Sequence, residues 1–372
     1  MYNKQMSIAI LEDNMKKFKI ISLTLALVMS LGVFAACGKT GETTSSSTAE
    51  SAASSTESGL YVDGTKVDVD TVLTIDGEDI GFDEYRYYYL TTRARFDGGN
   101  VELWKDAAAE ESKPVLKQYV LETIQSVLAF KRMAEQNNIT LSADELKSID
   151  ESIASAKDSL GGEEAYTSAL KDMNYTPELY KEMLTGNRLS SKVIKEIYGE
   201  RIKDDINSRY IHAKHILVKF DEAAAADLSA SSSSESTADT AASEAETLAK
   251  STDILQKIKD GADFDEMMAQ YNEDTGESED GYYFPEGKMV TEFYEGAKAL
   301  AEGEVSEPIK TTYGYHIIKR LPLEDSYLEK NMINMMSTEM SGIIDADVTA
   351  IMDKFEVTYS EHYNAIAPDT LL

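Results

Sequence analysis

The spacing of apolar positions along the chain changes once. Between about residues 82 and 200 apolar residues recur every three to four positions, as in Leu116, Val120 and Ile124, which is typical of helices that bury one face. From residue 211 to residue 218, apolar residues occur at both odd and even positions. Because alternate residues of a strand point to opposite faces, this is typical of a strand that is buried on both faces. The sequence therefore predicts a helical part followed by a part that contains a sheet.

Turn and capping signals delimit the elements of the helical part. Asp76-Gly77 separates two short apolar runs, which predicts a hairpin with a type I′ turn. Ser142 and Glu145 have the spacing of a capping box, and Gly161-Gly162 is typical of the end of the helix that follows. Thr176-Pro177 predicts the start of the next helix.

The second part alternates between short helical and strand-like segments. The pattern predicts helices at 248–259, 264–271 and 291–300, strands at 281–284 and 315–321, and a tail helix from about residue 325 that returns to the N-terminal helices. Residues 221–247 contain no Lys or Arg and are rich in Ala and Ser. This composition predicts a disordered acidic insertion in a loop.

Residues 1–37 have the pattern of an export signal. Lysines after Met15 precede an apolar stretch at 20–34, which is too short to span a membrane comfortably, and small residues then lead to Cys37. This arrangement resembles a bacterial lipoprotein signal, in which Cys37 would carry a diacylglyceryl anchor and Met15 would be the true start. An ordinary secretory signal with an incidental cysteine is the alternative. Residues 38–67 are predicted to form a disordered tether.

Charge and cysteine content exclude several classes of function. The chain has 67 acidic and 36 basic residues and a net charge of -31, which argues against nucleic-acid binding because that needs a basic surface. A single cysteine leaves no intrachain disulfide. His212 and His215 are three positions apart on a strand and so point to opposite faces, which makes a metal site there a weak interpretation.

Two of the four histidines, His215 and His316, lie in apolar strand-like segments. Between them lie the motifs Gly-Ala-Asp-Phe at 261–264, Gly-x-Met-Val-x-x-Phe at 287–293 and Gly-Glu-Val-Ser-Glu-Pro at 303–308. If the two segments pair as neighbouring strands, both imidazoles can face one pocket. That pocket would be the centre of the chemistry of this protein.

With these motifs in order, residues 210–321 resemble a parvulin, the PpiC-type domain of peptidyl-prolyl isomerases. Residues 68–205 resemble the helical chaperone domain of PrsA-like and SurA-like foldases, and with the lipoprotein signal the chain resembles a PrsA-like foldase lipoprotein. The resemblance implies an α+β fold: a helical chaperone domain at 68–205, and a parvulin domain at 206–322 with an antiparallel four-stranded sheet flanked by helices. A C-terminal segment at 323–372 would pack on the chaperone domain.

The family resemblance implies a site residue by residue. Met289 and Phe293 would form the socket for the proline ring. His215 and His316 match the histidine pair that shapes and hydrogen-bonds the pocket. Asp274 falls where the family carries Cys or Asp near the substrate carbonyl. The remaining matches are polar positions, Thr311 and Tyr313, of which Tyr313 replaces a commoner small residue.

The same resemblance implies a function outside a Gram-positive-type cell membrane. The protein would isomerise X–Pro bonds in emerging secreted polypeptides and chaperone them, without a cofactor or metal and without preference for phosphorylated substrates. The alternative is a holdase whose parvulin module is inactive, which Glu279-Asp280-Gly281-Tyr282 favours because many relatives have Gly-Gly-Asp-Leu-Gly there. The oligomeric state, including a homodimer, stays open.

Overall fold

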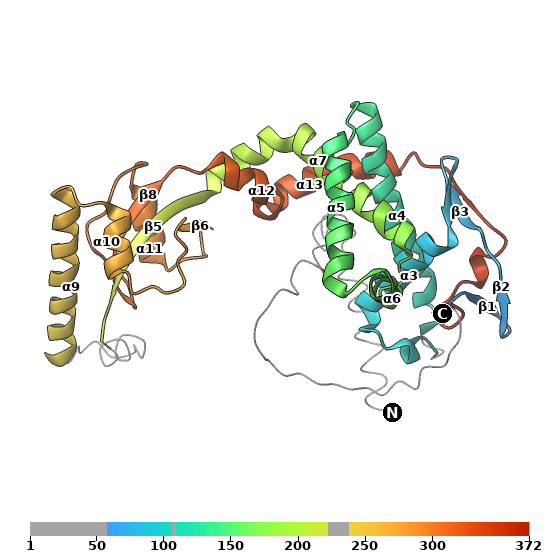
Figure 1. Ribbon diagram of the computed structural model, residues 1–372, viewed down its shortest axis with the longest axis horizontal. Helices are drawn as coiled ribbons and strands as arrows, with labels where there is room; N and C mark the ends of the chain where they lie inside the picture. Colours follow the sequence, from blue (N-terminus) through green and yellow to red (C-terminus); the bar gives the residue numbers. More distant parts are fainter. Residues whose placement is uncertain (1–57, 106–108, 222–237, 372) are drawn as a thin grey trace. The chain divides into compact units, whose positions relative to one another are not determined.

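The computed structural model describes residues 58–105, 109–221 and 238–371. These residues form two compact units, drawn in Figure 1: a helical unit within residues 1–199 and 338–372, and a sheet unit within residues 200–337. The predicted signal with Cys37, and the tether up to residue 57, lie outside the described residues.

Helices make up most of the helical unit. They are α3 (Phe82–Asp97), α4 (Ser112–Gln136), α5 (Ala143–Leu160), α6 (Glu163–Asp172), the first part of α7 (Pro177–Arg209) and α13 (Thr338–Met352), with 3-10 turns η1 (Val101–Lys105) and η3 (Tyr363–Ala365). Tyr85, Tyr88 and Tyr89 of α3 are fully buried in its core. These tyrosines therefore serve core packing.

The predicted caps of these helices are confirmed. The Ser142 Oγ accepts a hydrogen bond of 3.2 Å from the Glu145 backbone N–H, and Glu145 Oε2 accepts one of 2.8 Å from the Ser142 backbone N–H. Gly161 ends α5 in the left-handed conformation at φ 96°. Thr176 Oγ1 accepts a hydrogen bond of 3.1 Å from the Leu179 backbone N–H at the start of α7.

Two small sheets complete the helical unit. The predicted hairpin is confirmed as β3 (Thr71–Ile75) and β4 (Glu78–Gly81), because Asp76 and Gly77 both have positive φ, as a type I′ turn requires. β9 (Val357–Tyr359) pairs with β3 and was not predicted. β1 (Leu60–Val62) and β2 (Thr65–Val67) form a hairpin inside the predicted tether, so a tether that reaches residue 67 is wrong. The buried side chain of Leu60 holds this hairpin in the core.

The predicted four-stranded antiparallel sheet is confirmed in the sheet unit. Its order is β6 (Tyr282–Pro285), β5 (Tyr210–Lys219), β8 (Gly314–Leu321) and β7 (Ile309–Lys310). The unit also contains α9 (Ala238–Lys259), α10 (Phe264–Tyr271), α11 (Thr291–Ala299) and α12 (Asp325–Met335).

The two faces of this sheet are covered by different helices. On one face, Ile216 and Val218 of β5 pack with Ile254 of α9 and Phe264 of α10. On the other face, side chains of α11 pack on β5, β6 and β8. Since strand residues alternate between faces, the odd-numbered residues of β5 face α11 and the even-numbered residues face α9 and α10.

The structure corrects three predicted limits. α7 continues through Gly199 to Arg209, so the predicted domain limit at 205/206 falls within a helix. α9 already begins at Ala238, so disorder up to residue 247 is wrong. The tail forms two helices, α12 in the sheet unit and α13 in the helical unit, so a single returning helix is also wrong.

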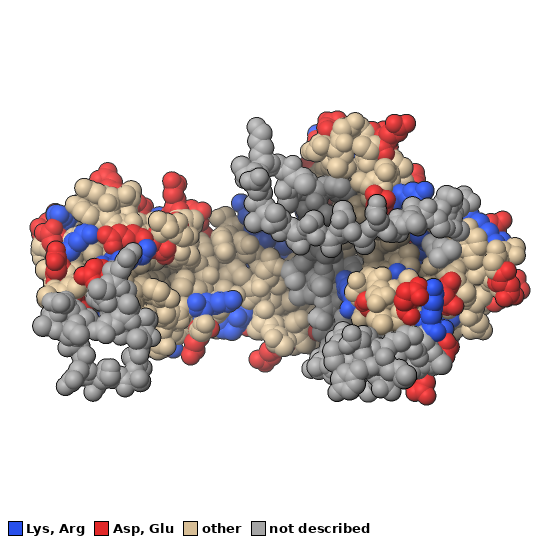
Figure 2. Space-filling model, turned by 90° about the horizontal axis from the view of Figure 1, so that it is seen from below, with Lys and Arg blue, Asp and Glu red and all other residues tan. Residues whose placement is uncertain are grey.

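Acidic and basic side chains are interspersed on the face shown in Figure 2. Red and blue side chains occur over both units there, and the basic ones form small groups. In the part of the chain that the structure describes, no helix combines the length and the apolar character that crossing a bilayer requires.

Candidate functional site

The pairing of β5 with β8 brings two histidines together. Leu217 lies opposite His316, and His215 lies opposite Ile318, so the two imidazoles are diagonal neighbours on one face of the sheet. Their ring centroids are 5.1 Å apart and the rings are tilted by 50°. The strand pairing that the sequence analysis assumed therefore exists, and it turns both rings toward α11.

Phe293 of α11 packs its ring against both imidazoles. The ring centroid lies 5.1 Å from that of His215 and 5.2 Å from that of His316, with interplanar angles of 82° and 81°. Such edge-to-face contacts are favourable between aromatic rings. Because α11 begins at Thr291, Met289 lies just before its first turn, four positions before Phe293, and both side chains line the same cavity.

A cavity of about 450 Å³ opens beside these rings. Six of the predicted site residues line it: His215, Asp274, Met289, Phe293, Tyr313 and His316. Five further lining residues were not predicted: Leu217, Lys219, Tyr282, Lys288 and Val290. The sequence-predicted residues thus converge on one concave site, with apolar side chains from α11 and its approach and polar side chains from the strands and loops.

Thr311 and Tyr313 take different places at this site. Thr311 is buried, and its Oγ1 lies 2.9 Å from His316 Nε2, so it contacts the ring without lining the cavity. The same Oγ1 accepts a hydrogen bond of 3.1 Å from the Tyr313 backbone N–H. The Tyr313 side chain is 57% exposed and lies at the cavity rim.

His316 is held as a neutral ring. Burial, followed by the neighbouring His215, lowers the pKa of His316 from 6.5 to about 3, and Asp274 opposes this change only partly. Removal of an imidazolium from water is costly, so the uncharged form is favoured inside the pocket. At neutral pH the cavity therefore presents an uncharged, partly apolar wall at this position.

Two carboxylates face the ring nitrogens of His215, and sequence reasoning identified only one of them. Glu277 Oε2 lies 3.3 Å from Nδ1, and Asp274 Oδ2 lies 3.5 Å from Nε2. The Glu277 side chain has no exposed surface. Its carboxylate accepts a hydrogen bond of 3.0 Å from the His215 backbone N–H and another of 2.7 Å from Asn272 Nδ2. Glu277 therefore holds the backbone of His215 by a hydrogen bond and places a buried carboxylate beside its Nδ1, behind the cavity.

The sequence contains a local turn signal next to Glu277, but this signal does not predict that Glu277 is buried. Asp274-Thr275-Gly276 is a turn signal, and the Asp274 Oδ1 accepts the Gly276 backbone N–H at 2.9 Å. A turn of this kind brings residues on its two sides close together. That Glu277 is buried rather than solvated depends on β5, which is distant in sequence.

Residues 279–282, which depart from the family pattern, still place the Tyr282 side chain in the site. The Tyr282 hydroxyl donates a hydrogen bond of 3.1 Å to Asp274 Oδ2, and burial and that bond raise the pKa of Tyr282 to about 12. Gly281 has φ 77°, and a Cβ there would lie 2.6 Å from the Ala213 carbonyl oxygen. Only glycine therefore fits the bend that places Tyr282.

His212 lies on the opposite face of β5 from His215, as predicted. Its ring stacks on Tyr283 at 3.8 Å, and its two nitrogens each lie 2.7 Å from a carbonyl oxygen, those of Pro322 and Asp280. This environment is that of a structural core residue. Across residues 58–105, 109–221 and 238–371, no group of three or more His, Cys, Asp or Glu has the arrangement of a metal site.

Solved structures that this chain is similar to include PrsA from Bacillus subtilis and NmPin, the parvulin of Nitrosopumilus maritimus. The former is 24% identical, with 69% of this chain and 86% of that chain covered and a TM-score of 0.25. The latter is 33% identical, with 31% of this chain and 97% of that chain covered and a TM-score of 0.21.

Curated relatives include two foldase proteins. Foldase protein PrsA of Oceanobacillus iheyensis is 29% identical over 235 residues, which are 61% of this chain and 66% of that protein. Foldase protein PrsA 3 of Bacillus cereus is 30% identical over 217 residues, which are 56% of this chain and 64% of that protein. The chain thus spans slightly less than two thirds of the length of these relatives.

Two family models match consecutive parts of the chain. The SurA-like N-terminal domain matches residues 11–194, and the PPIC-type PPIASE domain matches residues 197–321. The second match contains the whole histidine cavity, and the limit between them falls inside α7. With this order of domains, the chain belongs to the PrsA-like foldases, which join a SurA-like N-terminal domain to a PPIC-type PPIase domain.

Proposed function

We propose that the sheet unit catalyses cis–trans isomerisation of X–Pro peptide bonds. The observation that carries this proposal is the single cavity that combines an apolar floor, two paired imidazoles and a carboxylate. The match to the PPIC-type PPIASE domain supports it, because the matched residues include every residue of that cavity.

The reaction needs a pocket that favours a twisted amide. Resonance makes the peptide bond planar and sets a barrier of about 18–20 kcal/mol to its rotation. The planar amide carries partial positive charge on nitrogen and partial negative charge on oxygen, and twisting removes this separation. An environment with little water therefore favours the twisted transition state over the planar ground state.

The lining residues supply such an environment. Met289, Val290 and Phe293 hold the proline ring in the apolar part of the cavity, and the neutral His316 keeps that part uncharged. The Asp274 carboxylate, oriented by Tyr282, lies where the substrate carbonyl would approach. Negative charge near that oxygen disfavours the charge-separated planar amide, so no covalent intermediate is needed.

The proposal extends to the whole chain as a foldase for secreted polypeptides. The curated relatives carry the name foldase, and the SurA-like match covers the N-terminal part of the helical unit, up to residue 194. The export pattern before Cys37 supports lipid anchoring on the outer face of the cell membrane. Emerging polypeptides with X–Pro bonds would be the substrates, because uncatalysed isomerisation takes tens to hundreds of seconds and limits folding.

A protease-coupled assay with a proline peptide tests the isomerase step in the intact chain. We expect His215→Ala combined with His316→Ala to lower kcat/KM by about 100-fold, which corresponds to about 2.7 kcal/mol of transition-state stabilisation. His362→Ala, a histidine of the other unit, is the matched control and should retain the wild-type rate. An unchanged rate in the double variant would overturn the pocket assignment.

The same measurements separate the proposal from the holdase alternative. Aggregation of an unfolded client is followed by light scattering beside the isomerase assay. If the wild-type protein suppresses aggregation but shows no isomerase activity, the proposed isomerase function is wrong and the protein is a holdase.

A further inference from the structure

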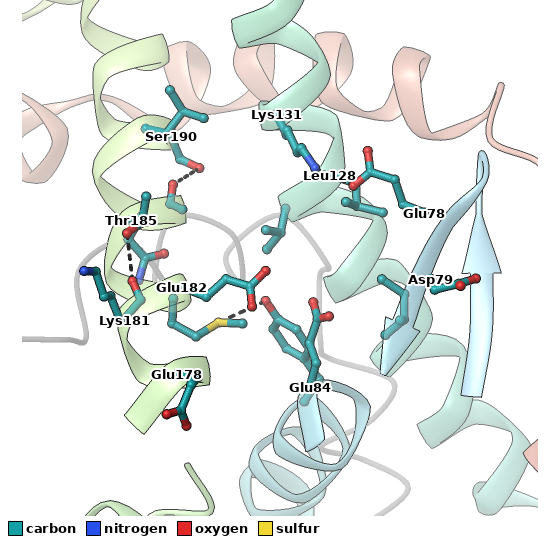
Figure 3. A pocket seen from close by; sticks show the side chains of 17 residues that line it. Glu78, Asp79, Glu84, Leu128, Lys131, Glu178, Lys181, Glu182, Thr185 and Ser190 are labelled. Carbon is teal, nitrogen blue, oxygen red and sulfur yellow. Dashed lines mark hydrogen bonds and ion pairs between the residues drawn. The ribbon is translucent and has the colours of Figure 1, made fainter. Parts of the chain in front are cut away.

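The helical unit contains a second cavity, shown in Figure 3, with a volume of about 600 Å³. It lies between β4, α3, α4 and α7, and all its lining residues belong to this unit. Part of its lining is apolar: Ile80, Tyr88, Val127, Leu128, Met183 and Leu189. The family match assigns no ligand to this cavity.

Carboxylates occupy the middle of this cavity. Figure 3 shows Glu84 of α3 and Glu182 of α7 pointing toward one another, whereas Glu178 and Asp79 point away from the centre. Glu84 is half-buried, and burial followed by the charge of Glu182 raises its pKa to about 7. Glu182 is exposed and faces Glu84 across a partly apolar space, where its charge disfavours ionisation of Glu84.

The lysines that line the cavity are paired with other acids. Lys131 forms an ion pair with Glu78, as Figure 3 shows, and Lys181 Nζ lies 2.6 Å from Asp150 Oδ1. Within the described residues, neither Glu84 nor Glu182 has a Lys or Arg within ion-pair distance. The charge of Lys131 lowers the pKa of Glu84, but less than burial, Glu182 and Glu78 raise it, and in the described part of the chain no cation contacts Glu84 or Glu182 directly.

We propose that this cavity binds an extended polypeptide segment in which an Arg or Lys side chain adjoins an apolar one. The cation would lie between Glu84 and Glu182, and the apolar neighbour would contact Leu128 and Met183. This inference rests on the proposed action on unfolded polypeptides but not on the isomerase step.

A basic side chain fits this lining better than a metal ion. Arg and Lys have aliphatic stems that pack along apolar surface while the charged end reaches a carboxylate. A Ca²⁺ ion takes six to eight oxygen ligands, and no metal-binding group of acids or histidines occurs among the described residues. A volume of about 600 Å³ lies within the range of about 300–1,000 Å³ that is usual for ligand pockets.

Binding of a cation would be linked to the protonation of Glu84. A positive charge beside Glu84 favours its ionised form, so binding releases a proton from the fraction of molecules that hold one. Because the pKa of Glu84 is about 7 in the free protein, affinity for a basic segment should increase between pH 6 and pH 8.

Fluorescence anisotropy with two labelled peptides tests the proposal on the intact chain. Both peptides lack proline and differ only in a central Arg-Leu or Gln-Leu pair. We expect the Arg peptide to bind at least about tenfold more tightly at pH 8. Glu84→Gln combined with Glu182→Gln should remove this difference, whereas Glu164→Gln, an exposed acid of α6 outside the cavity, should keep it.

The isomerase rate of each variant is measured on the same samples. Loss of Arg preference with an unchanged isomerase rate supports the inference. Equal binding of both peptides to wild-type protein with an intact isomerase rate overturns the inference and leaves the proposed function standing. If Ca²⁺ saturates a site at Glu84 and Glu182 and neither peptide binds, the two acids form a metal site, and this result also overturns the inference.

Discussion

The cavity beside β5 and β8 holds two imidazoles beside aromatic rings, whereas in the cavity beside α3 and α7 the carboxylates of Glu84 and Glu182 face each other. Burial acts on both, in opposite directions. It lowers the pKa of His316 and raises that of Glu84, because in each case it favours the uncharged form. The difference lies in the neighbours: His215 has carboxylates at both nitrogens, while Glu84 faces another acid.

Under the two proposals, this contrast separates a site for a neutral amide from a site for a positively charged side chain. In the histidine cavity, Thr311 contacts His316 Nε2 and Tyr282 donates a hydrogen bond to Asp274, whereas both ring nitrogens of His215 face carboxylates beyond hydrogen-bond geometry. In the acidic cavity, burial and neighbouring acids favour the protonated form of Glu84, and a cationic ligand would favour its ionised form. Variants in one cavity should therefore leave the properties of the other unchanged, since the two lie in different units.

The largest effect is expected from Phe293→Ala. The Phe293 ring contacts both imidazoles and is 3% exposed, so its removal opens a hole under the pocket. We expect a stability loss of about 3–5 kcal/mol and an isomerase rate near that of the uncatalysed reaction. Phe293→Leu should restore most of the stability but not the rate. Urea unfolding and the proline-peptide assay measure the two quantities, and a Phe293→Ala rate within twofold of wild type would contradict the assignment.

The next effect is expected from Glu277→Gln. Gln keeps the shape but removes the charge that faces His215 Nδ1, so the ring loses the buried carboxylate beside it. We expect kcat to fall about tenfold with a stability loss of about 1–3 kcal/mol. Asp274→Asn, at a side chain that is 29% exposed, should lower kcat with less effect on stability. Equal stability of wild-type and Glu277→Gln proteins would show that the buried charge is not needed there.

A pH effect of intermediate size is expected for the sheet unit. His316 has a folded-state pKa of about 3, below its usual 6.5, so the unfolded chain binds more protons between these values. Stability therefore decreases as pH falls from 6.5, by about 2 kcal/mol at pH 5. His316→Phe should lack this contribution. Unfolding curves of both proteins at pH 7 and pH 5 give the difference, and parallel changes would contradict the burial argument.

The smallest effect, and one of opposite sign, is expected for the helical unit. Glu84 has a folded-state pKa of about 7, above its usual 4.5, so the folded chain binds more protons between these values. Stability therefore decreases as pH rises from 4.5 to 7, on the order of 1–2 kcal/mol after allowance for partial exposure. Glu84→Gln should be more stable than wild type at pH 8 and similar at pH 4. Thermal unfolding at both values measures this, and a less stable variant at pH 8 would contradict it.

Local signals predicted much of the fold. The Asp76-Gly77 turn and the Ser142–Glu145 capping box depend only on residues close together in the sequence, so both could be predicted from it. The β9 strand was missed because its pairing partner β3 lies almost at the other end of the chain. The helical pattern was predicted to end near residue 200, but α7 continues to Arg209, because the buried Ile202 and Ile206 offset the cost of about 1 kcal/mol that the helical Gly199 carries.

The sequence predicted the histidine and phenylalanine rings of the site but not the residues that contact and support them. His215, His316 and Phe293 belong to family motifs and converge as expected. Glu277 and Tyr282 lie in turns whose direction depends on packing against β5, which no local pattern encodes. The acidic cavity was not predicted at all, because Glu84 and Glu182 come from helices far apart in sequence.

The only tryptophan of the chain, Trp104 of η1, is fully buried in the helical unit. Its Nε1 donates a hydrogen bond of 2.8 Å to Asp97 Oδ2, and Asp97 also pairs with Arg93 at 3.2 Å. Indole emission depends on polarity, so unfolding of this unit alone shifts the emission maximum. The molecule thus carries its own optical probe: fluorescence follows one unit while circular dichroism follows both, and the melting of the two can be told apart without labels.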